Sequence, residues 1–329
     1  MTSFFAFRVE NPTAGKPPEC HIRQLQFDDL SPGDTIIKVA FAGVNYKDAL
    51  AANGQGKIVR DYPRITGIDL SGHIVSSTNP QLKEGDPVVV HGFGLGVEYD
   101  GGHAQYARVS SDWVMPLPIG LSLREAATLG AAGYTAALAL HWMEMCGLSP
   151  DQGEIAVTGA TGGVASIAID ILNHRGYQAV AITGKHAAHD YLKKLGAARV
   201  IAVPNLEATG PLASGQWAGA IDSVGGSVLA WLLRTTKPEG VITAFGNAGG
   251  ASLSTSVFPF ILRGVKLLGI NAGGPMALRR KIWNKLATEY RPDHLNAICQ
   301  VISLHNLPQV TKQMLERKTT GRHVIDMAL

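Results

Sequence analysis

The stretch 155-IAVTGATGGVASIAIDIL-172, near the middle of the chain, restricts the possible folds more than any other segment. A strand-like apolar run, a glycine turn and a helical apolar pattern follow one another, which is the order of a dinucleotide-binding unit. Gly159 lets the chain turn off the strand, while Gly162 and Gly163 leave space for a pyrophosphate beside the first amides of the helix. The spacing is G-x-x-G-x-x-A rather than G-x-G-x-x-G, so the motif is a weak signal unless its surroundings support it.

The segments after this turn repeat the alternation of strand and helix. Apolar, β-branched runs without polar alternation are typical of strands that are buried on both faces of a parallel sheet. Repeated strand–helix units therefore predict an α/β fold with a doubly wound parallel sheet and right-handed crossovers. The predicted strands are 154–159, 178–184, 199–203, 218–224, 241–246 and 265–271, and the predicted helices are 163–175 and 187–195.

The segments on either side of this sheet have a different pattern. In front of it, short β-rich runs bounded by Gly, Pro, Asp or Asn predict a small barrel or sandwich. These runs are 35–44, 72–77, 86–92 and 103–109. Ser122 and Glu125 form a capping box, so a helix begins there. Behind the sheet, helices are predicted at 276–288, 293–303 and 307–318, followed by a last strand at 322–328.

Composition and charge exclude several classes of protein. The 329 residues provide enough material for about two domains. A formal net charge of +3 argues against a general nucleic-acid surface, and no apolar run is long enough to span a membrane. Cys20, Cys146 and Cys299 are scattered, and the N-terminal stretch MTSFFAFRVENP lacks the features of a secretory signal. We therefore expect a cytoplasmic protein.

The end of the second predicted strand of the sheet indicates which dinucleotide is bound. NAD sites usually carry an acidic residue there, whereas this strand ends in 182-ITGK-185 without a carboxylate. Thr183 offers a hydroxyl, Gly184 leaves space, Lys185 adds positive charge, and Arg199 at the start of the next strand adds a second cation. These residues favour the 2′-phosphate of NADPH over NAD. The alternative is that Lys185 is only a solvated residue at the start of a helix.

A polar cluster, 45-NYKDAL-50, directly follows a predicted strand of the front segment. Its polar side chains could reach a nicotinamide and a bound carbonyl, with Tyr46 stacking on the ring or donating a proton; they are Asn45, Tyr46, Lys47 and Asp48. The alternative is an ordinary helix cap that begins at Asn45, with Asp48 in the first turn. The glycine-rich stretch 91–109 contains His and acidic residues without a compact ligand spacing, so we predict no metal site.

The arrangement of the whole chain resembles the medium-chain dehydrogenase/reductase superfamily, in which a GroES-like catalytic domain from both chain ends surrounds an inserted Rossmann domain. This resemblance implies a catalytic domain of residues 1–120 and 272–329 and an NADPH-binding domain of residues 121–271. Zinc alcohol dehydrogenases of the superfamily carry a Cys near Tyr46 and Gly-His-Glu where 67-GID-69 stands. Both signatures are absent here, so the chain looks like the zinc-free, quinone-oxidoreductase-like branch.

Several motifs in the same order resemble the YhdH/AcuI subfamily, whose members are NADPH-dependent acryloyl-CoA reductases. They are 45-NYKDALA-51, 54-GQGKIVRDYP-63, 67-GIDLSG-72, 158-TGATGGV-164, 183-TGK-185, 217-WAGAIDSVGG-226 and 258-FPFILRGVKL-267. The implied reaction is conjugate reduction of acryloyl-CoA without a metal. An NADPH:quinone oxidoreductase on the same fold and a non-catalytic NADPH-binding sensor or structural protein remain alternatives.

The same resemblance implies roles for individual residues. Tyr46 lies against the nicotinamide, and the 2′-phosphate is held by Thr183, Gly184, Lys185 and Arg199. The pyrophosphate is held by Thr161, Gly162, Gly163 and Val164, and the nicotinamide pocket is lined by Asn247 and Ile261. Asn247 stands where an apolar residue is expected, and 270-INAGGPM-276 is unlike relatives, so the acyl pocket is open to change. A homodimer is the family expectation, with 265–271 as an edge strand that pairs across a two-fold axis.

Overall fold

The computed structural model describes residues 3–10, 18–206 and 210–329, which form two compact units. Unit 1 contains Met1–Ala131, Pro275–Arg280 and Cys299–Leu329, and unit 2 contains Ala132–Gly274 and Lys281–Ile298. Both ends of the chain therefore belong to the same unit. This division differs from the expected one in three places, because 121–131 belongs to unit 1, whereas 272–274 and 281–298 belong to unit 2.

The first of these differences has a local cause in helix α2 (Leu123–Met145). Gly130 breaks its helical backbone, with φ 47° and ψ −146°, one residue before the division between the units. This conformation is accessible to glycine, and a Cβ at Gly130 would lie 2.5 Å from Oδ2 of Asp69. The predicted capping box begins this helix as expected, with Ser122 N donating to Glu125 at 2.8 Å and Glu125 N to Ser122 Oγ at 3.2 Å.

Unit 2 is built on a six-stranded parallel sheet with the order β11-β10-β9-β12-β13-β14. Its strands are β9 (Glu154–Thr158), β10 (Gln178–Ile182), β11 (Arg199–Ile201), β12 (Trp217–Asp222), β13 (Thr236–Ala244) and β14 (Lys266–Gly269). Its helices are α3 (Gly163–His174), α4 (His189–Lys194), α5 (Gly226–Thr235), α6 (Phe258–Arg263) and α8 (Leu295–Ile298), with short 3-10 turns η3 (Pro150–Gln152) and η4 (His186–Ala188). Helix α7 (Met276–Ala287) contributes residues to both units.

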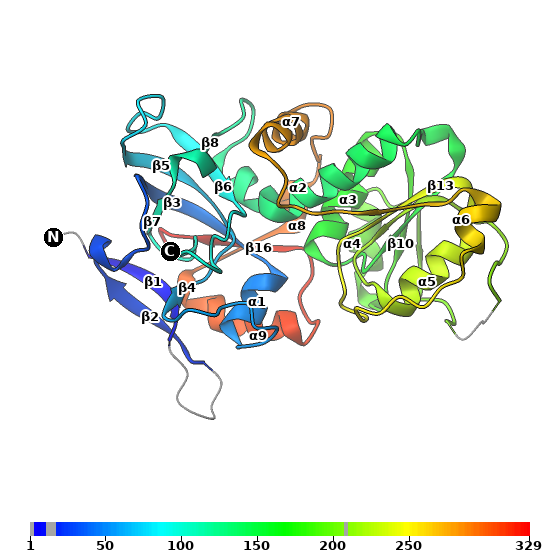
Figure 1. Cartoon of the computed structure of the whole chain (residues 1–329), viewed down its shortest axis with the longest axis horizontal. Coiled ribbons are helices and arrows are strands. Elements are labelled where there is room, and N and C mark those ends of the chain that lie inside the picture. Colours follow the sequence, from blue (N-terminus) through cyan, green and yellow to red (C-terminus); the bar gives the residue numbers. More distant parts are fainter. Residues whose placement is uncertain (1–2, 11–17, 207–209) are drawn as a thin grey trace. The chain divides into compact units, whose positions relative to one another are not determined.

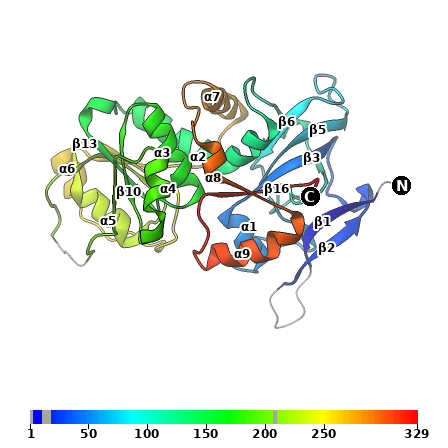
Figure 2. The same cartoon turned by 180° about the vertical axis from the view of Figure 1, so that it is seen from behind.

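The strand order confirms the predicted doubly wound sheet. In chain order, β10 and β11 are added on one side of β9, and β12, β13 and β14 are then added on its other side. Right-handed crossovers therefore place α3 and α4 on one face, where Figure 2 shows them in front of the sheet, and α5 on the other. The sequence order reverses between β9 and β12, and ligands of such sheets bind at this switch point, beyond the carboxyl ends of the strands.

Unit 1 consists mainly of strands, as predicted, and most of them pair in antiparallel fashion (Figure 1). Its strands are β1 (Phe4–Val9), β2 (Cys20–Leu25), β3 (Thr35–Val44), β4 (Arg64–Ile65), β5 (Asp69–Ser77), β6 (Pro87–His91), β7 (Tyr106–Val109), β8 (Met115–Pro116), β15 (Cys299–Ile302) and β16 (Arg322–Asp326). Its helices are α1 (Tyr46–Ala52) and α9 (Leu307–Leu315), with 3-10 turns η1 (Phe27–Asp29), η2 (Ser111–Trp113) and η5 (Leu304–Asn306).

The long strand β3 joins the two ends of the chain in one sheet. It pairs with β5 and β7 from the front segment and with β16 from the tail, so its residues contribute to a shared core. The prediction of a helix over 293–303 was wrong in its second half, because Cys299–Ile302 forms strand β15 and pairs in parallel with β16. Backbone pairing with a distant strand thus determined the conformation of a segment whose local pattern indicated a helix.

Candidate active site

The glycine turn of unit 2 lies at the switch point of the sheet. Gly159 turns off β9 with φ 59°, and a Cβ there would lie 2.4 Å from Ser223 Oγ. Gly162 N donates to Gly159 O at 2.8 Å, and Gly162 is the N-cap of α3. The first N–H groups of this 12-residue helix have no partner within the helix, and together with its dipole they favour an anion. The structure thus brings Thr161, Gly162, Gly163 and Val164 together at one helix N-terminus.

A buried aspartate, which we did not single out from the sequence, shapes the other side of the switch point. Asp222 ends β12 and is fully buried, and burial is the main reason that its pKa is raised. Its carboxylate accepts hydrogen bonds from the Thr158 hydroxyl at 2.6 Å and from Gly225 N at 2.8 Å. It therefore joins the ends of β9 and β12, where the strand order reverses. The only sequence signal was its place near the end of the predicted strand 218–224, within 217-WAGAIDSVGG-226.

The loop after β13 carries Asn247 and lies beside the turn that follows β12. Gly249 N donates to Val224 O at 2.7 Å, and a Cβ on Gly225 would lie 3.3 Å from the Cα of Asn247. The structure therefore places exposed Asn247 beside the turn that follows β12. Ile261, the other residue expected in the nicotinamide pocket, lies on α6 with 66% of its surface exposed.

The residues expected to bind a 2′-phosphate follow β10. Thr183 N donates to Ile201 O at 3.1 Å, and Lys185 N donates to Thr183 Oγ1 at 3.1 Å, which closes a tight turn. A Cβ on Gly184 would meet no atom within 4 Å, so the space beside this turn is open. Lys185 is partly buried, and burial lowers its pKa. Thr183, Gly184 and Lys185 therefore form one group at the carboxyl end of the sheet.

Arg199 does not join this group, which corrects the expectation from the sequence. It pairs in register with Val180 in the middle of β10, and its guanidinium makes a bidentate ion pair with Glu154, at distances of 2.7 and 2.6 Å. Glu154 is the first residue of β9, so the guanidinium points toward the amino-terminal edge of the sheet, away from Lys185. The hydrogen bonds from Arg199 lower the pKa of Glu154, which fits a structural pair on the surface.

In unit 1, the polar cluster after β3 forms the start of helix α1. Asp48 is fully buried, and each of its carboxylate oxygens accepts backbone N–H groups: Oδ2 from Asn45 at 2.8 Å, and Oδ1 from Gly67 at 3.2 Å and Ile68 at 3.0 Å. Burial is the largest influence on the pKa of Asp48 and raises it. The carboxylate thus holds the helix start and the neighbouring loop, which is the capping role that we had left open.

Asn45 belongs to a buried network that reaches the last strand. Its Nδ2 donates to Asp69 Oδ2 at 2.8 Å, and its Oδ1 accepts from Arg322 of β16 at 2.9 Å. Asp69 also accepts Gly43 N at 2.8 Å and Ala131 N at 3.0 Å. Asn45 and Asp48 were expected as catalytic residues, but the structure shows their polar atoms engaged within the unit. Tyr46, the first residue of α1, is 44% exposed, and it and exposed Lys47 are the polar members of the cluster that can meet a ligand.

The buried His and acidic residues of the glycine-rich stretch, His91, Asp100 and His103, are likewise engaged within unit 1. Arg279 donates to His91 Nδ1 at 2.9 Å, and burial, followed by the Arg279 charge, lowers the pKa of His91 well below its ordinary range. His103 Nδ1 lies 2.8 Å from Thr66 Oγ1, and Asp100 accepts Ile65 N at 2.9 Å. Among the described residues, no group of three or more His, Cys, Asp or Glu side chains is placed to hold a metal ion.

Comparison with known proteins assigns the chain to a family. Residues 31–119 match the alcohol dehydrogenase GroES-like domain, and residues 163–288 match the zinc-binding dehydrogenase family. The acrylyl-CoA reductase AcuI of Ruegeria pomeroyi is 40% identical over 327 residues, which cover 98% of this chain and 99% of AcuI. The yhdH oxidoreductase of Salmonella enterica, solved in complex with NADP, is 38% identical with a TM-score of 0.95, covering 98% of this chain and 99% of that one.

A third relative was solved with a different dinucleotide. The Bacillus subtilis protein yhfP, with NAD bound, is 43% identical with a TM-score of 0.96, and the match covers 99% of this chain and all of that one. All three relatives match over nearly the full length of both chains, so the similarity extends to both units. The chain therefore belongs to the YhdH/AcuI group within the quinone-oxidoreductase-like branch of the medium-chain dehydrogenase/reductase superfamily.

Proposed function

We propose that this protein is an NADPH-dependent oxidoreductase that reduces the carbon–carbon double bond of acryloyl-CoA to give propionyl-CoA. The observation that carries this proposal is the 40% identity to AcuI over nearly the whole of both chains. The glycine turn at the switch point and the carboxylate-free end of β10 support it independently. Unit 2 is then the NADPH-binding domain and unit 1 the catalytic domain, close to the division 121–271 against 1–120 and 272–329.

The residues of unit 2 fit the phosphate groups of NADPH. The first amides of α3, at Gly163 and Val164, would hold the pyrophosphate together with Thr161, and the N-cap Gly162 would leave space for it. Thr183, Gly184 and Lys185 would hold the 2′-phosphate, because the group offers a hydroxyl, open space and a positive charge. The NADP complex of the Salmonella yhdH oxidoreductase supports this choice. Because yhfP was solved with NAD bound, the preference for NADPH over NADH is tested directly below.

The chemistry requires little more than orientation and stabilisation of charge. Bound NADPH would supply a hydride to the β-carbon of the substrate. The π electrons of the double bond then move toward the thioester, whose oxygen becomes an enolate, and hydrogen-bond donors aimed at this oxygen would lower the barrier. Tyr46, or a water molecule, would deliver a proton to the α-carbon, while Asn45 and Asp48 hold the start of α1 and so position Tyr46. Asn247 and Ile261 remain candidates for the nicotinamide pocket.

The proposal is tested by following the near-ultraviolet absorbance of NADPH with acryloyl-CoA, crotonyl-CoA and a simple quinone at matched concentrations. We expect fast oxidation with acryloyl-CoA and much slower oxidation with the quinone. A preference for the quinone would assign the protein to quinone reduction on the same fold. Tight NADPH binding without oxidation by any acceptor would instead indicate a sensor or structural protein.

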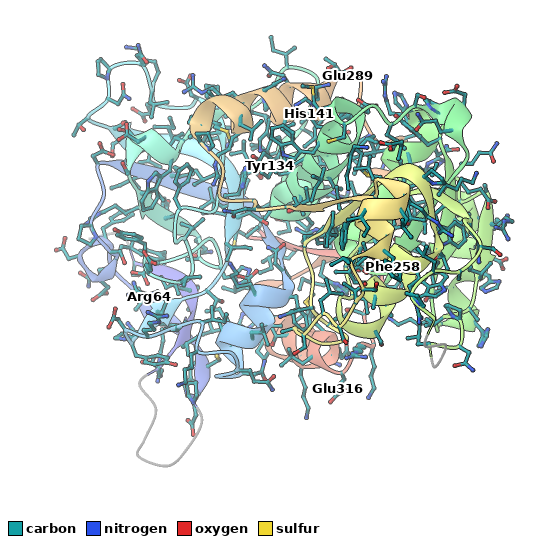
Figure 3. All side chains as sticks on the ribbon, turned by 45° about the vertical axis from the view of Figure 1, so that its right-hand side comes forward. Arg64, Tyr134, His141, Phe258, Glu289 and Glu316 are labelled. Carbon is teal, nitrogen blue, oxygen red and sulfur yellow. The ribbon has the colours of Figure 1, made fainter. Side chains whose placement is uncertain are left out.

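We further infer that the protein is a homodimer that pairs along β14. This strand is at the edge of the six-stranded sheet, so one row of its backbone groups is unpaired within the described part of the chain. The neighbouring helix α6 exposes Phe258, labelled in Figure 3, by 41%, Ile261 by 66% and Leu262 by 64%. Light scattering should give twice the monomer mass, and Ile261→Glu should shift it toward the monomer. A wild-type monomer would contradict the inference.

We also propose a cytoplasmic location. Cys20, Cys146 and Cys299 are all free thiols, as expected in a reducing compartment. No helix in the described part of the chain is long and apolar enough to cross a membrane. Fractionation of cells that produce the protein should recover it with cytoplasmic markers, and recovery with membranes or with secreted protein would contradict this proposal.

A further inference from the structure

Two histidines directly follow the group that we assign to the 2′-phosphate. After Lys185, the 3-10 turn η4 begins at His186 and continues into α4 at His189. Both imidazoles are exposed, and their ring centroids are 6.2 Å apart, as expected for residues three apart on one helical face. Neither makes an ion pair with any described residue. Three nitrogen side chains that can carry positive charge therefore lie within five residues, at the carboxyl end of β10.

The neighbouring strand ends add no charge to this region. The turn after β9, 158-TGATGG-163, and the segment after β11, 201-IAVPNL-206, contain no ionisable side chain. On α4, Asp190 lies one helical turn beyond His186. Lys193 is directed elsewhere, since its Nζ donates to Ala198 O at 2.6 Å. Lys194 ends the helix. In the described part of this region, a change of charge near neutral pH therefore depends on the two histidines, because histidine is the side chain that ordinarily gains or loses a proton there.

We propose that His186 is a pH-dependent part of the 2′-phosphate site, so that preference for NADPH over NADH increases as the pH falls from about 8 to about 6. This inference rests on the proposed use of NADPH. Lys185 supplies a charge throughout this range, whereas an imidazole supplies one only after it gains a proton. A phosphate monoester carries close to two negative charges near neutral pH, so a protonated His186 beside Lys185 would form a second charge-assisted hydrogen bond. His186 is assigned this contact because it adjoins Lys185, whereas His189 begins the next turn.

The direction of the pH effect follows from linkage. A bound phosphate stabilises the protonated imidazole, so the additional affinity is present at low pH and is lost as the pH rises and the imidazole releases its proton. The phosphate itself takes up a proton near pH 6, which weakens binding in the same range. A variant without the imidazole retains only the effect of phosphate protonation. The difference in pH dependence between this variant and the wild type therefore measures the contribution of the histidine.

The experiment measures binding of 2′,5′-ADP and 5′-AMP by calorimetry at about pH 6 and about pH 8. The proteins are the wild type, His186→Gln and the matched control His189→Gln. For wild type and His189→Gln, we expect the ratio of the affinity for 2′,5′-ADP to the affinity for 5′-AMP to be about tenfold higher at the lower pH than at the higher pH. For His186→Gln, the ratio should stay constant or decrease. Because both residues are exposed, unchanged thermal melting should show that the variants fold normally.

Two results would overturn the assignment of His186. One is that the affinity ratio of His186→Gln depends on pH as it does in the wild type. The other is that only His189→Gln loses this pH dependence. Neither result bears on acryloyl-CoA reduction by the wild type, so the proposed function would stand. If the wild type binds 2′,5′-ADP no better than 5′-AMP at any pH, the 2′-phosphate site is itself absent, and both this inference and the NADPH assignment fail.

Discussion

Replacement of Asp69 by Asn should strongly destabilise unit 1, although the two side chains have almost the same shape. The Asp69 carboxylate accepts Gly43 N at 2.8 Å, Asn45 Nδ2 at 2.8 Å and Ala131 N at 3.0 Å. The Arg322 guanidinium lies 3.7 Å from Oδ2, and both side chains are nearly inaccessible, at 1% and 3%. An amide in this place would turn an NH₂ group toward at least one N–H donor and would leave the Arg322 charge without its buried partner.

The magnitude follows from these contacts. Removing one partner of a buried ion pair costs about 3–5 kcal/mol, and an orphaned backbone N–H costs about 1–3 kcal/mol. Because the two terms share the same atoms, they do not add fully, and we expect a loss of about 4 kcal/mol in the free energy of unfolding. For a unit of this size, such a loss should lower the melting temperature by about 10 °C. Asp86→Asn is the matched control, since Asp86 caps Lys83 N at 2.8 Å in an exposed turn.

Scanning calorimetry and circular dichroism would measure the effect, and a double-mutant cycle would show whether it arises from the pair. Arg322→Gln alone should also destabilise, because Arg322 donates to Val44 O and Thr128 O, each at 2.9 Å. The double variant should be at least about 1 kcal/mol more stable than the sum of the single effects predicts. The reasoning is refuted if Asp69→Asn melts like the Asp86→Asn control, or if the two substitutions are strictly additive.

Three further predictions concern the proposed chemistry. Lys185→Ala should raise KM for NADPH by about tenfold or more in steady-state kinetics, with little effect on KM for NADH. The control Arg199→Ala should change neither KM. Equal effects of Lys185→Ala on both cofactors would count against the 2′-phosphate role of Lys185. Tyr46→Phe should lower kcat by about 10²-fold or more if its hydroxyl donates the proton, and an unchanged kcat would leave Tyr46 with a packing role. Exhaustive chelation should leave acryloyl-CoA reduction at its full rate, and a loss of activity that zinc restores would refute the metal-free mechanism.

The sequence was most informative where local pattern and tertiary structure agree. The parallel sheet of unit 2 could be predicted from two signals. Buried parallel strands are apolar on both faces, and the first three strands are separated by helices that end in a glycine. The capping box at Ser122 and Glu125 was predicted from two residues alone, because a capping motif is complete within one turn. Such features depend on neighbours in the chain, so a single sequence contains the information to find them.

Long-range pairing leaves no trace in the local pattern of the sequence. Strand β15 was predicted as part of a helix because its partner β16 lies beyond another helix in the sequence. The contact of Arg322 with Asp69 and Asn45 joins the two ends of the chain, and no local spacing indicates it. Arg199 was assigned to the 2′-phosphate because it opens a strand, but the register of β11 on β10 directs it toward Glu154. Register depends on the partner strand and cannot be deduced from one strand.

The polar cluster after β3 shows how a structure separates catalytic candidates from structural ones. Asn, Asp and Ser are preferred both at helix starts and in active sites, so residue type alone cannot distinguish the two roles. A count of hydrogen bonds can, because a carboxylate whose oxygens already accept buried N–H groups has no capacity left for substrate. By this criterion Asp48 and Asp69 support the site rather than act in it. Tyr46 and Lys47 remain as the exposed polar side chains of the cluster, and the buried network that ends at Arg322 determines where their helix begins.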